Sequence, residues 1–381
     1  MRIAAYAPLK PIDHPVPSGD RRVARLIDAA LREAGHSVEW AARLRSRDGA
    51  GNPDRQARIA RLGAGIAARL VRRWRAASPQ TRPDLWFTYH LYYKAPDHVG
   101  PAVADALGIP YVVAEASVAM KRAGGPWDLG HRATLAALAR ADAVIALNPG
   151  DREAVDGRLR AGAKRATLAP FLDVRPYAAA ATARDMHRDA WARRLRIDAG
   201  VPWLVAVAMK RPGDKLDSYR VLGAALERLA ARDWRLIVAG DGPARVAVDT
   251  ALAPLGSRVT HAGQIDEAAL PGLLAACDLF TWPAVGEAYG MALLEAHATG
   301  LPAVAGEGPG VAAILAHAKT GLLVPPRDDA AFAAAVAALL DDPARLAAYG
   351  HAAAAKAARA HGLGGAARSL DALLAGLGAR Q

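Results

Sequence analysis

The sequence predicts two successive α/β domains, each built on a parallel sheet. Short apolar runs that suit buried strands alternate with stretches whose apolar residues recur three or four positions apart. The chain has 381 residues, which is too long for one typical hydrophobic core, so two domains are expected. The alternation loosens between about residues 170 and 195 and then resumes, which places a hinge between two halves of similar size.

The first half opens with a strand, a loop, a helix and a strand. The run RIAAYAP suits a short buried strand, and the loop PIDHPVPSGD follows it. Val23, Ile27 and Leu31 then recur at helical spacing, and Gly35 is placed to end that helix. Further strands are expected at HSVEWAA, PDLWFTYH, PYVVAEA and AVIALN, with helices at HRATLAALARA and GDREAVDGRLRAG. This order is typical of a parallel sheet with crossover helices.

The second half repeats the alternation. Strands are expected at PWLVAVAM, RLIVAG, VTHAG, DLFTWPA and PAVAG, and helices at YRVLGAALERLAAR, EAALPGLLAAC and GMALLEAHATG. The predicted division is a first domain at 1–180, a linker at 181–199, a second domain at 200–362 and a C-terminal helix at 363–381. Doubly wound sheets bind ligands at the carboxyl ends of their strands, so two facing domains of this kind are expected to form a cleft.

Composition narrows the class of protein. No apolar window is long enough for a spanning helix, and the opening MRIAAYAPLKP lacks the features of a signal peptide. Cys277 is the only cysteine, so an intramolecular disulfide framework is excluded and a reducing compartment fits. These features favour a cytoplasmic protein.

The charge is concentrated in the first half. Residues 1–190 hold 30 Lys and Arg against 19 Asp and Glu, a net of +11, whereas the remainder holds 19 against 18. A basic half favours a polyanionic partner such as nucleic acid, an anionic membrane or an acidic substrate. The alternative is a compositional bias toward Arg and Ala. Nucleic acid is not expected as a partner, because only the pI supports it and no zinc-finger or RNA-recognition signature is present.

Two carboxylates flank a loop and a helix start in GEAYGMALLE. Glu287 lies in the loop that follows the strand DLFTWPA, and Glu295 lies about one and a half turns into a helix that starts near Gly290. Free amides of the first helical turn would point toward a ligand here. A carboxylate can accept two hydroxyl hydrogen bonds, so the pattern suits a nucleotide sugar, with diols at both ends and phosphate between them. The alternative is two acids on a solvated helix.

Three cations crowd the turn AMKRPGDKLDSY, directly after the strand PWLVAVAM. Lys210, Arg211 and Lys215 would hold a diphosphate at the carboxyl end of that strand and stabilise it as a leaving group. A solvated turn is the alternative.

These motifs resemble the retaining glycosyltransferases of family four, which have the two-domain GT-B architecture. The family pattern of two glutamates separated by seven residues stands here as EAYGMALLE, and the family turn GDGP stands intact at 240–243. The tail GPGVAAILAHAKTGLLVPPRDD also matches, with Ala313 in place of the usual Glu. The resemblance implies two Rossmann-like, doubly wound domains and a C-terminal helix that returns to the N-terminal domain.

The resemblance also implies roles for individual residues. Glu295 would bind the ribose hydroxyls, and Glu287 would contact the donor hexose together with the backbone of Ala288, Tyr289, Gly290 and Met291. The family holds the diphosphate with an Arg and a Lys five residues later. Here either Lys210 replaces the Arg beside Lys215, or Arg211 acts after a shift of one residue. The catalytic residues are accordingly expected to be Glu287, Lys210 and Lys215.

The first half carries weaker matches to the family. Ser18-Gly19 stands where the family has a Gly-Gly pair closing on the phosphates, so Gly19 is a donor-binding candidate. Glu115 stands where the family often has a His, and His90 is another candidate for the acceptor side. The alternative for His90 is a packed histidine beside its tyrosine neighbours. No metal site and no cofactor are expected, because the isolated Asp-His pairs lack the spacing of metal ligands and cationic side chains can neutralise the diphosphate.

A basic amphipathic helix is expected at about 52–77. Asn52 and Pro53 suit its start, and Ile59, Leu62, Ile66, Leu70 and Trp74 form one apolar stripe. Residues 55–75 carry seven arginines and no acid. Such a helix can lie on an anionic membrane, with Arg69, Arg72, Arg73 and Trp74 at the interface. The alternative is a stripe packed on the sheet with solvated arginines.

The expected function is therefore transfer of a hexose, with retention, from a nucleotide-sugar donor to a glycan or lipid-linked acceptor. Peripheral attachment to the inner face of the cytoplasmic membrane follows if the basic helix meets lipid. The alternatives are a soluble sugar-phosphate glycosyltransferase or a nucleotide-sugar epimerase of the same fold.

Overall fold

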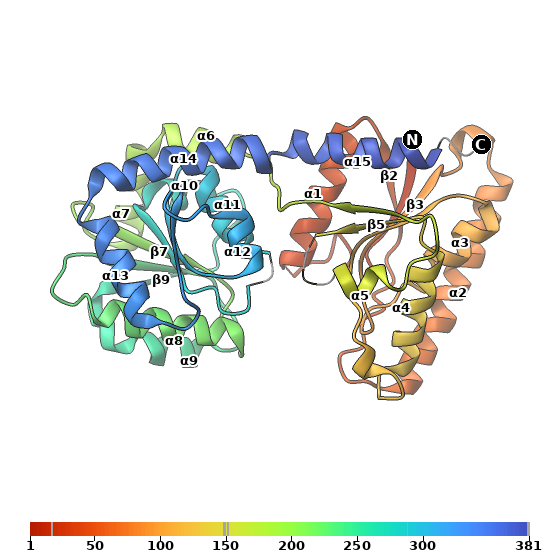
Figure 1. The fold of residues 1–381 in the computed structure, drawn as a ribbon, viewed down its shortest axis with the longest axis horizontal. Helices are drawn as coiled ribbons and strands as arrows, with labels where there is room; N and C mark the ends of the chain where they lie inside the picture. The colour runs from red at the N-terminus through yellow and green to blue at the C-terminus, as the bar shows by residue number, and fades with distance from the viewer. Residues whose placement is uncertain (17, 148–149, 151, 288, 379–381) are drawn as a thin grey trace. The chain divides into compact units, whose positions relative to one another are not determined.

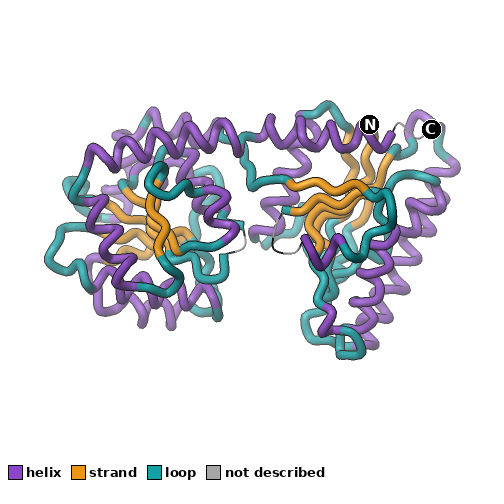
Figure 2. Tube along the Cα trace, viewed as in Figure 1, coloured by secondary structure: helices purple, strands orange, loops and turns teal. Residues whose placement is uncertain are grey.

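The computed structural model describes residues 1–16, 18–147, 150, 152–287 and 289–378. The chain forms two compact units (Figure 1). The first unit comprises Met1–Ala169 and Leu363–Gln381, and the second comprises Pro170–Gly362. Each unit has a central sheet enclosed by helices, drawn in orange and purple in Figure 2.

The first unit contains a six-stranded sheet of order β2-β1-β3-β4-β5-β6 in which every pair is parallel. The order reverses between β1 and β3, which is the kind of point where doubly wound sheets place ligands. Its strands are β1 (Arg2–Tyr6), β2 (Ser37–Ala42), β3 (Leu85–Leu91), β4 (Tyr111–Ala116), β5 (Ala143–Ala146) and β6 (Lys164–Thr167). Its helices are α1 (Gly19–Glu33), α2 (Pro53–Ala76), η1 (Pro79–Thr81), α3 (Gly100–Leu107), η2 (Met120–Arg122), α4 (Asp128–Arg140), α5 (Arg152–Asp156) and α15 (Leu363–Gly378).

The second unit repeats this architecture with the order β12-β11-β10-β7-β8-β9, again all parallel. Here the order reverses between β7 and β10. Its strands are β7 (Trp203–Val207), β8 (Arg235–Ala239), β9 (Val259–Gly263), β10 (Leu279–Trp282), β11 (Ala303–Gly306) and β12 (Gly321–Val324). Its helices are α6 (Arg175–Thr182), α7 (Arg184–Leu195), α8 (Asp214–Glu227), α9 (Arg245–Leu252), η4 (Ala253–Arg258), α10 (Leu270–Ala276), α11 (Met291–Ala298), α12 (Pro309–Ile314), α13 (Asp329–Leu340) and α14 (Pro343–His361).

The C-terminal helix returns to the N-terminal domain, as expected. α15 packs against α1 within the first unit, and Figure 1 shows it, in dark blue, beside the red α1. His36, which follows α1, also lies 3.4 Å from Asp371 on α15. The two predicted Rossmann-like domains and the returning helix are thus confirmed.

The basic helix exists, but its apolar face differs from the predicted stripe. Leu62 is 50% exposed, whereas Gly63 is buried. Gly63 lies so close to His98 that a Cβ at this position would be 2.5 Å from Cβ of His98. The helix therefore uses its glycine to approach the segment before α3. Trp74 is 3% exposed and packs edge-on against Trp86 at 6.3 Å. The expectation that Trp74 sits at a membrane interface is wrong for this fold, because the indole belongs to the core.

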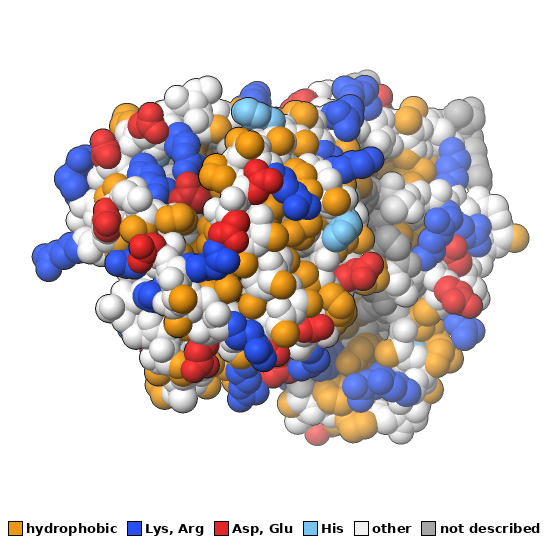
Figure 3. Space-filling view, turned by 60° about the vertical axis from the view of Figure 1, so that its left-hand side comes forward, with side chains coloured by type: hydrophobic (Ala, Val, Ile, Leu, Met, Phe, Trp, Pro, Cys, Tyr) orange, Lys and Arg blue, Asp and Glu red, His pale blue; other side chains and the backbone are white. Residues whose placement is uncertain are grey.

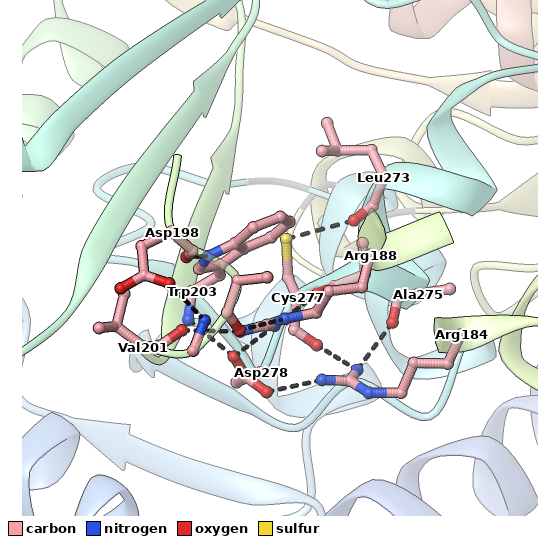
Figure 4. Close-up of polar contacts among 12 residues, drawn as sticks. Arg184, Arg188, Asp198, Val201, Trp203, Leu273, Ala275, Cys277 and Asp278 are labelled. Atoms are coloured by element: carbon pink, nitrogen blue, oxygen red, sulfur yellow. Dashed lines mark hydrogen bonds and ion pairs between the residues drawn. The ribbon is translucent and has the colours of Figure 1, made fainter. Parts of the chain in front are cut away.

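The expected linker at 181–199 is largely helical in the structure and packs in the second unit, and the units divide at 169/170 and 362/363. Figure 4 shows the contacts that fix α7 there: the guanidinium groups of Arg184 and Arg188 both reach the carboxylate of Asp278, at 2.6 and 2.8 Å. Asp278 also accepts the amide of Trp203 at 2.7 Å. One carboxylate thus joins α7 to the starts of β7 and β10. Beside it, burial raises the pKa of the Cys277 thiol, which favours an unreactive, protonated group.

We expect Asp278→Asn to lower the free energy of unfolding of the second unit by about 2 kcal/mol, because two guanidinium groups lose their anionic partner. The side chain of Asp278 is 22% exposed. Solvent screening therefore makes this loss of stability smaller than the loss from breaking a fully buried ion pair. Urea denaturation of both proteins measures the difference. Asp233→Asn removes an exposed carboxylate from the same unit and should change little; equal stabilities of the two variants would contradict the role of Asp278.

Candidate functional site

The site in the second unit is built where the loop after β10 meets the first turn of α8. The amide of Val285 donates to Oγ of Ser218 at 3.0 Å, and that hydroxyl donates to the carbonyl of Asp214 at 2.8 Å. Gly286 has a φ of +61°, and a Cβ there would lie 2.5 Å from Oδ2 of Asp214. A glycine is therefore required for the loop to lie this close to the helix start.

This arrangement brings Lys215 and Glu287 together. Nζ of Lys215, in the first turn of α8, donates to Oε2 of Glu287. The same carboxylate oxygen lies 3.4 Å from Nε1 of Trp282, and the ammonium lies 5.4 Å from the centre of that indole. Both side chains are part-buried, at 32% and 19% exposure. An ammonium group has three donors, so Lys215 can hold Glu287 and a phosphate oxygen at once.

Lys210 does not join this pair. Its side chain is 2% exposed, and the ammonium lies 3.0 Å from Asp249 on α9 and 3.1 Å from Nδ1 of His261 on β9. Burial opposes the charge of Asp249, but the hydrogen bond and charge of Lys210 outweigh it and lower the pKa of that carboxyl group. Burial and the Lys210 charge lower the pKa of His261. The predicted cluster of three cations thus divides: Lys210 joins the end of β7 to α9 and β9, while Arg211 is exposed.

The GDGP turn fixes the backbone of Lys210, whose side chain does not join the Lys215–Glu287 pair. The amide of Lys210 donates to the carbonyl of Asp241, and its carbonyl accepts the amide of Ala244. A Cβ at Gly242 would lie 2.4 Å from the carbonyl oxygen of Lys210, so the two backbones are in direct contact. The intact GDGP turn and Lys210 form one structural unit.

The helix α11 begins at the predicted place. Gly290 caps it with a φ of +71°, Met291 is its first residue, and Glu295 is buried in its second turn. The first amides of an α-helix have no intrahelical acceptor, which suits phosphate binding next to Lys215. Tyr289 is part-buried and precedes the capping Gly290. Ala288, also predicted to contact the donor, lies outside the described residues.

In the first unit, Gly19 is the first residue of α1 after the capping Ser18. A Cβ added at Gly19 would meet no atom within 4 Å. Packing within the described part of the protein therefore does not require glycine here, which leaves room for a ligand to approach the helix start.

The two acceptor-side candidates lie close together, and a third residue, Asp20, lies beside one of them, His90. Nδ1 of His90, at the end of β3, lies 3.1 Å from Oδ1 of Asp20 on α1 and 3.8 Å from Oε2 of Glu115 at the end of β4. His90 and Glu115 have φ values of +64° and +58°. A left-handed backbone costs a non-glycine residue roughly 1–2 kcal/mol, and such strain is concentrated at functional sites.

Several residues of these sites were not predicted from the sequence. Four of them contact predicted site residues: Trp282, Asp20, Asp249 and His261. Two others, Asp214 and Ser218, hold the loop that carries Glu287. Trp282 ends β10, and Asp20 and Asp214 lie in the first turn of a helix, whereas the positions of Ser218, Asp249 and His261 offer no comparable signal. Across the described part of the chain, no group of three His, Cys, Asp or Glu residues is arranged to hold a metal ion, and no helix there combines the length and apolarity that crossing a bilayer needs.

The comparisons with known proteins agree with this geometry. The model of the family "Glycosyl transferases group 1" matches residues 203–342, which include Lys215, Glu287 and Glu295. The second unit belongs to the group 1 glycosyl transferases. The resemblance inferred from the motifs is thereby confirmed for this group 1 domain.

Curated relatives match over part of their length. The chain is 33% identical over 127 residues to an alpha-D-kanosaminyltransferase of Streptomyces kanamyceticus, which is 33% of each chain. It is 33% identical over 129 residues to a D-rhamnosyltransferase of Pseudomonas aeruginosa, covering 33% of this chain and 34% of that protein. The chain thus spans about a third of the length of these relatives, and their names give different sugars.

Solved structures match over the whole chain. A sucrose-phosphate synthase from Thermosynechococcus elongatus has a TM-score of 0.73 at 19% identity and covers 100% of both chains. HepE of Anabaena in complex with UDP-glucose has a TM-score of 0.71 at 17% identity and covers 99% of this chain and 100% of that one. At these identities the likeness establishes the fold, the two-domain GT-B architecture.

Proposed function

We propose that this protein is a retaining glycosyltransferase that moves a hexose from a nucleotide-diphosphate sugar to a glycan or lipid-linked acceptor. The observation that carries the proposal is the Lys215–Glu287 pair, held beside the start of α11 in a group 1 domain. A cation paired with a carboxylate just before a helix start supports the binding of a nucleotide sugar. The names of the relatives, which are sugar transferases, and the UDP-glucose complex of HepE support the same donor class.

Each residue has a chemical role in this proposal. Glu295 binds the ribose diol, Glu287 binds hexose hydroxyls, and Lys215 with Arg211 neutralises the diphosphate without a divalent metal ion. The bond between the anomeric carbon and the phosphate oxygen breaks, and its electron pair leaves with the diphosphate. The acceptor oxygen forms the new bond on the same face, and its proton passes to the departing phosphate. Charge that develops on the leaving group is what Lys215 stabilises.

A donor panel tests the proposal. UDP-glucose, GDP-mannose and ADP-glucose are incubated with the protein in EDTA, and release of free nucleoside diphosphate is followed. Turnover of at least one donor is expected, with binding shown by a rise in thermal stability. Absence of both binding and turnover for every donor would contradict the proposed activity.

The exposed face of α2 supports an anionic surface as the location of the acceptor. Arg73 pairs with Glu39 at 2.6 Å. No carboxylate of the described residues forms an ion pair with five other arginines of this helix: Arg55, Arg58, Arg61, Arg69 and Arg72. The 50% exposed Leu62 lies among them. By contrast, acidic and basic side chains are interspersed on the face of the second unit in Figure 3, so attraction to anionic lipid is assigned to the first unit.

We expect the protein to co-sediment with vesicles containing phosphatidylserine and not with neutral vesicles. Replacing Arg61, Arg69 and Arg72 with Ser should remove about 3 kcal/mol of attraction, roughly a hundredfold in binding, because each basic residue near the surface contributes about 1 kcal/mol. Binding should also weaken as salt rises, since surface charge is screened within about 10 Å at 0.1 M.

A charge-matched control separates location from net charge. Replacing Arg193, Arg194 and Arg359 in the second unit with Ser removes the same charge and should leave vesicle binding nearly unchanged. Equal loss in both triple variants would show that only net charge matters. Unchanged binding of the α2 variant would favour a soluble acceptor instead.

A further inference from the structure

Two cations share one pair of aromatic rings in the first unit. The ring centres of Tyr93 and Trp127 lie 5.9 Å apart, with an angle of 83° between the ring planes. Nζ of Lys94 lies 5.7 Å from the centre of the Tyr93 ring and 5.0 Å from that of Trp127. The guanidinium carbon of Arg122 lies 5.2 Å from both ring centres. These four residues form a cation–aromatic cluster that is separate from the donor site of the second unit.

The cluster lies at the edge of the sheet where ligands are expected. Tyr93 and Lys94 follow the end of β3, and Arg122 and Trp127 follow the end of β4. These two strands are parallel neighbours, so their carboxyl ends meet at the same edge of the sheet. Doubly wound sheets bind their ligands outside this edge.

The loop after β2 fixes the indole of Trp127. Nε1 of Trp127 donates to the carbonyl of Asp48 at 3.0 Å, and the amide of Asp48 donates to the carbonyl of Lys94 at 2.8 Å. Gly51 has a φ of +73°, and a Cβ there would lie 3.1 Å from Cε2 of Trp127. The loop therefore lies directly against the indole, which is held by contacts that involve no cationic side chain.

The described part of the protein supplies no anion to either cation. No carboxylate among the described residues pairs with Lys94 or Arg122, and neither charged group forms a hydrogen bond with them. Nε of Arg122 is enclosed without a hydrogen-bond partner there, which is rare for a buried donor. The nearby carboxylates are engaged elsewhere: Asp48 and Asp97 are buried and each accept two backbone amides of their own loops, and Asp128 pairs with an arginine of its own helix at 2.9 Å.

We propose that Lys94 and Arg122 form a binding site for the phosphate group of a phosphomonoester. Such a group carries about −1.5 to −2 charges at pH 7, which matches two cations, whereas a carboxylate carries a single charge. A guanidinium that stacks on an aromatic ring still donates two parallel hydrogen bonds from its edge, and an ammonium adds a compact charge with three donors. All the residues belong to the first unit, so the proposal does not rest on glycosyl transfer.

The indole of Trp127 gives a local readout of binding. Its Nε1–H resonance, assigned as the one missing in Trp127→Phe, is followed by NMR in the nitrogen-labelled full chain while glycerol 3-phosphate is added. We expect a shift that saturates. Acetate at the same ionic strength should give no saturable shift. Absence of a saturable shift with glycerol 3-phosphate would overturn the proposal.

Variants assign the binding to the two cations. Arg122→Gln and Lys94→Gln should each weaken it about tenfold or more, because each removes a charge-assisted hydrogen bond. Arg158→Gln is the matched control, since Arg158 is an exposed cation of the same unit, and it should bind like the parent. Equal loss in Arg158→Gln would overturn the proposal. So would full affinity in both cluster variants, because the cations would then serve only to cover the rings.

Lys215→Ala separates this site from the donor site in the second unit. The Trp127 shift should saturate at the same concentration of glycerol 3-phosphate in this variant as in the parent, even if the protein turns over no nucleotide sugar. Loss of the shift in Lys215→Ala would place the bound phosphate at the donor site and overturn the proposal.

Vesicles distinguish a soluble ligand from a lipid headgroup, because phosphatidic acid presents a phosphomonoester on a membrane. If Arg122→Gln weakens the binding of glycerol 3-phosphate but not co-sedimentation with vesicles containing phosphatidic acid, the site takes a soluble phosphomonoester. Weakening of both assigns it to a lipid headgroup. Unchanged binding of glycerol 3-phosphate, with equal losses on phosphatidic acid and phosphatidylserine vesicles, would overturn the phosphate site, because Arg122 would then respond only to surface charge.

Discussion

Lys215→Ala should lower the turnover of the nucleotide sugar by about a hundredfold to a thousandfold, the loss typical of removing one group that stabilises charge in a transition state. The loss should appear in kcat more than in the affinity for the nucleoside monophosphate, because the charge develops on the departing diphosphate. The variant also leaves Glu287 without its cationic partner. Steady-state kinetics and nucleotide titration of the folded variant measure both effects.

Lys319→Ala provides the control, since Lys319 is an exposed lysine of the same unit and should leave turnover unchanged. The activity of the parent should persist in EDTA, because cationic side chains neutralise the diphosphate in this proposal. Strict dependence on a divalent ion, or a Lys215→Ala variant with full turnover, would contradict the role given to Lys215.

Glu295→Gln should weaken the binding of nucleotide and nucleotide sugar by about tenfold to a hundredfold. A carboxylate that accepts hydroxyl hydrogen bonds contributes roughly 1.5–3 kcal/mol, and the neutral amide keeps the volume of a side chain that is 3% exposed. Isothermal titration with UDP, GDP and ADP measures the affinity. Because the ribose is common to all donors with the same nucleotide, the loss of affinity should be the same whichever hexose the donor carries.

Glu227→Gln, at an exposed position on α8, tests whether the loss of one negative charge alone changes affinity, and it should not. A Glu295→Gln variant that is folded and binds the nucleotide as tightly as the parent would remove Glu295 from the donor site.

The sequence was informative where a pattern reflects a local physical requirement. Strands such as β7 and β10 are buried apolar runs, and Glu287, Gly290 and Glu295 belong to one motif, so their place at the start of α11 followed directly. The edge strands β6 and β12 were not predicted: KRAT has two basic residues among its four, unlike a buried apolar run, and GLLV lies inside the tail that was interpreted only as a family motif. Helices α13 and α14 were also missed beside the family tail motif.

Side-chain direction was the main source of error. Lys210 and Lys215 are equally cationic in the sequence, but only the position of Asp249 on α9 shows that Lys210 turns away from the loop after β10. Trp74 lies on the helical stripe that suits either lipid or a core, and the partner that decides, Trp86, lies on another element. The contact of Asp20 with His90 could not be predicted, because it depends on how α1 packs beside the end of β3. Long-range contacts of this kind are not encoded in spacing.

The configuration of the first product tests the central claim most directly. The protein is incubated in EDTA with a donor whose hexose is α-linked to the diphosphate, and the hexose released to water is observed by proton NMR before mutarotation. A retaining glycosyltransferase should give the α-anomer first, with formation of one nucleoside diphosphate per hexose, and the Lys215→Ala variant should slow both signals equally. Initial release of the β-anomer, or no release with any donor that binds, would contradict the account.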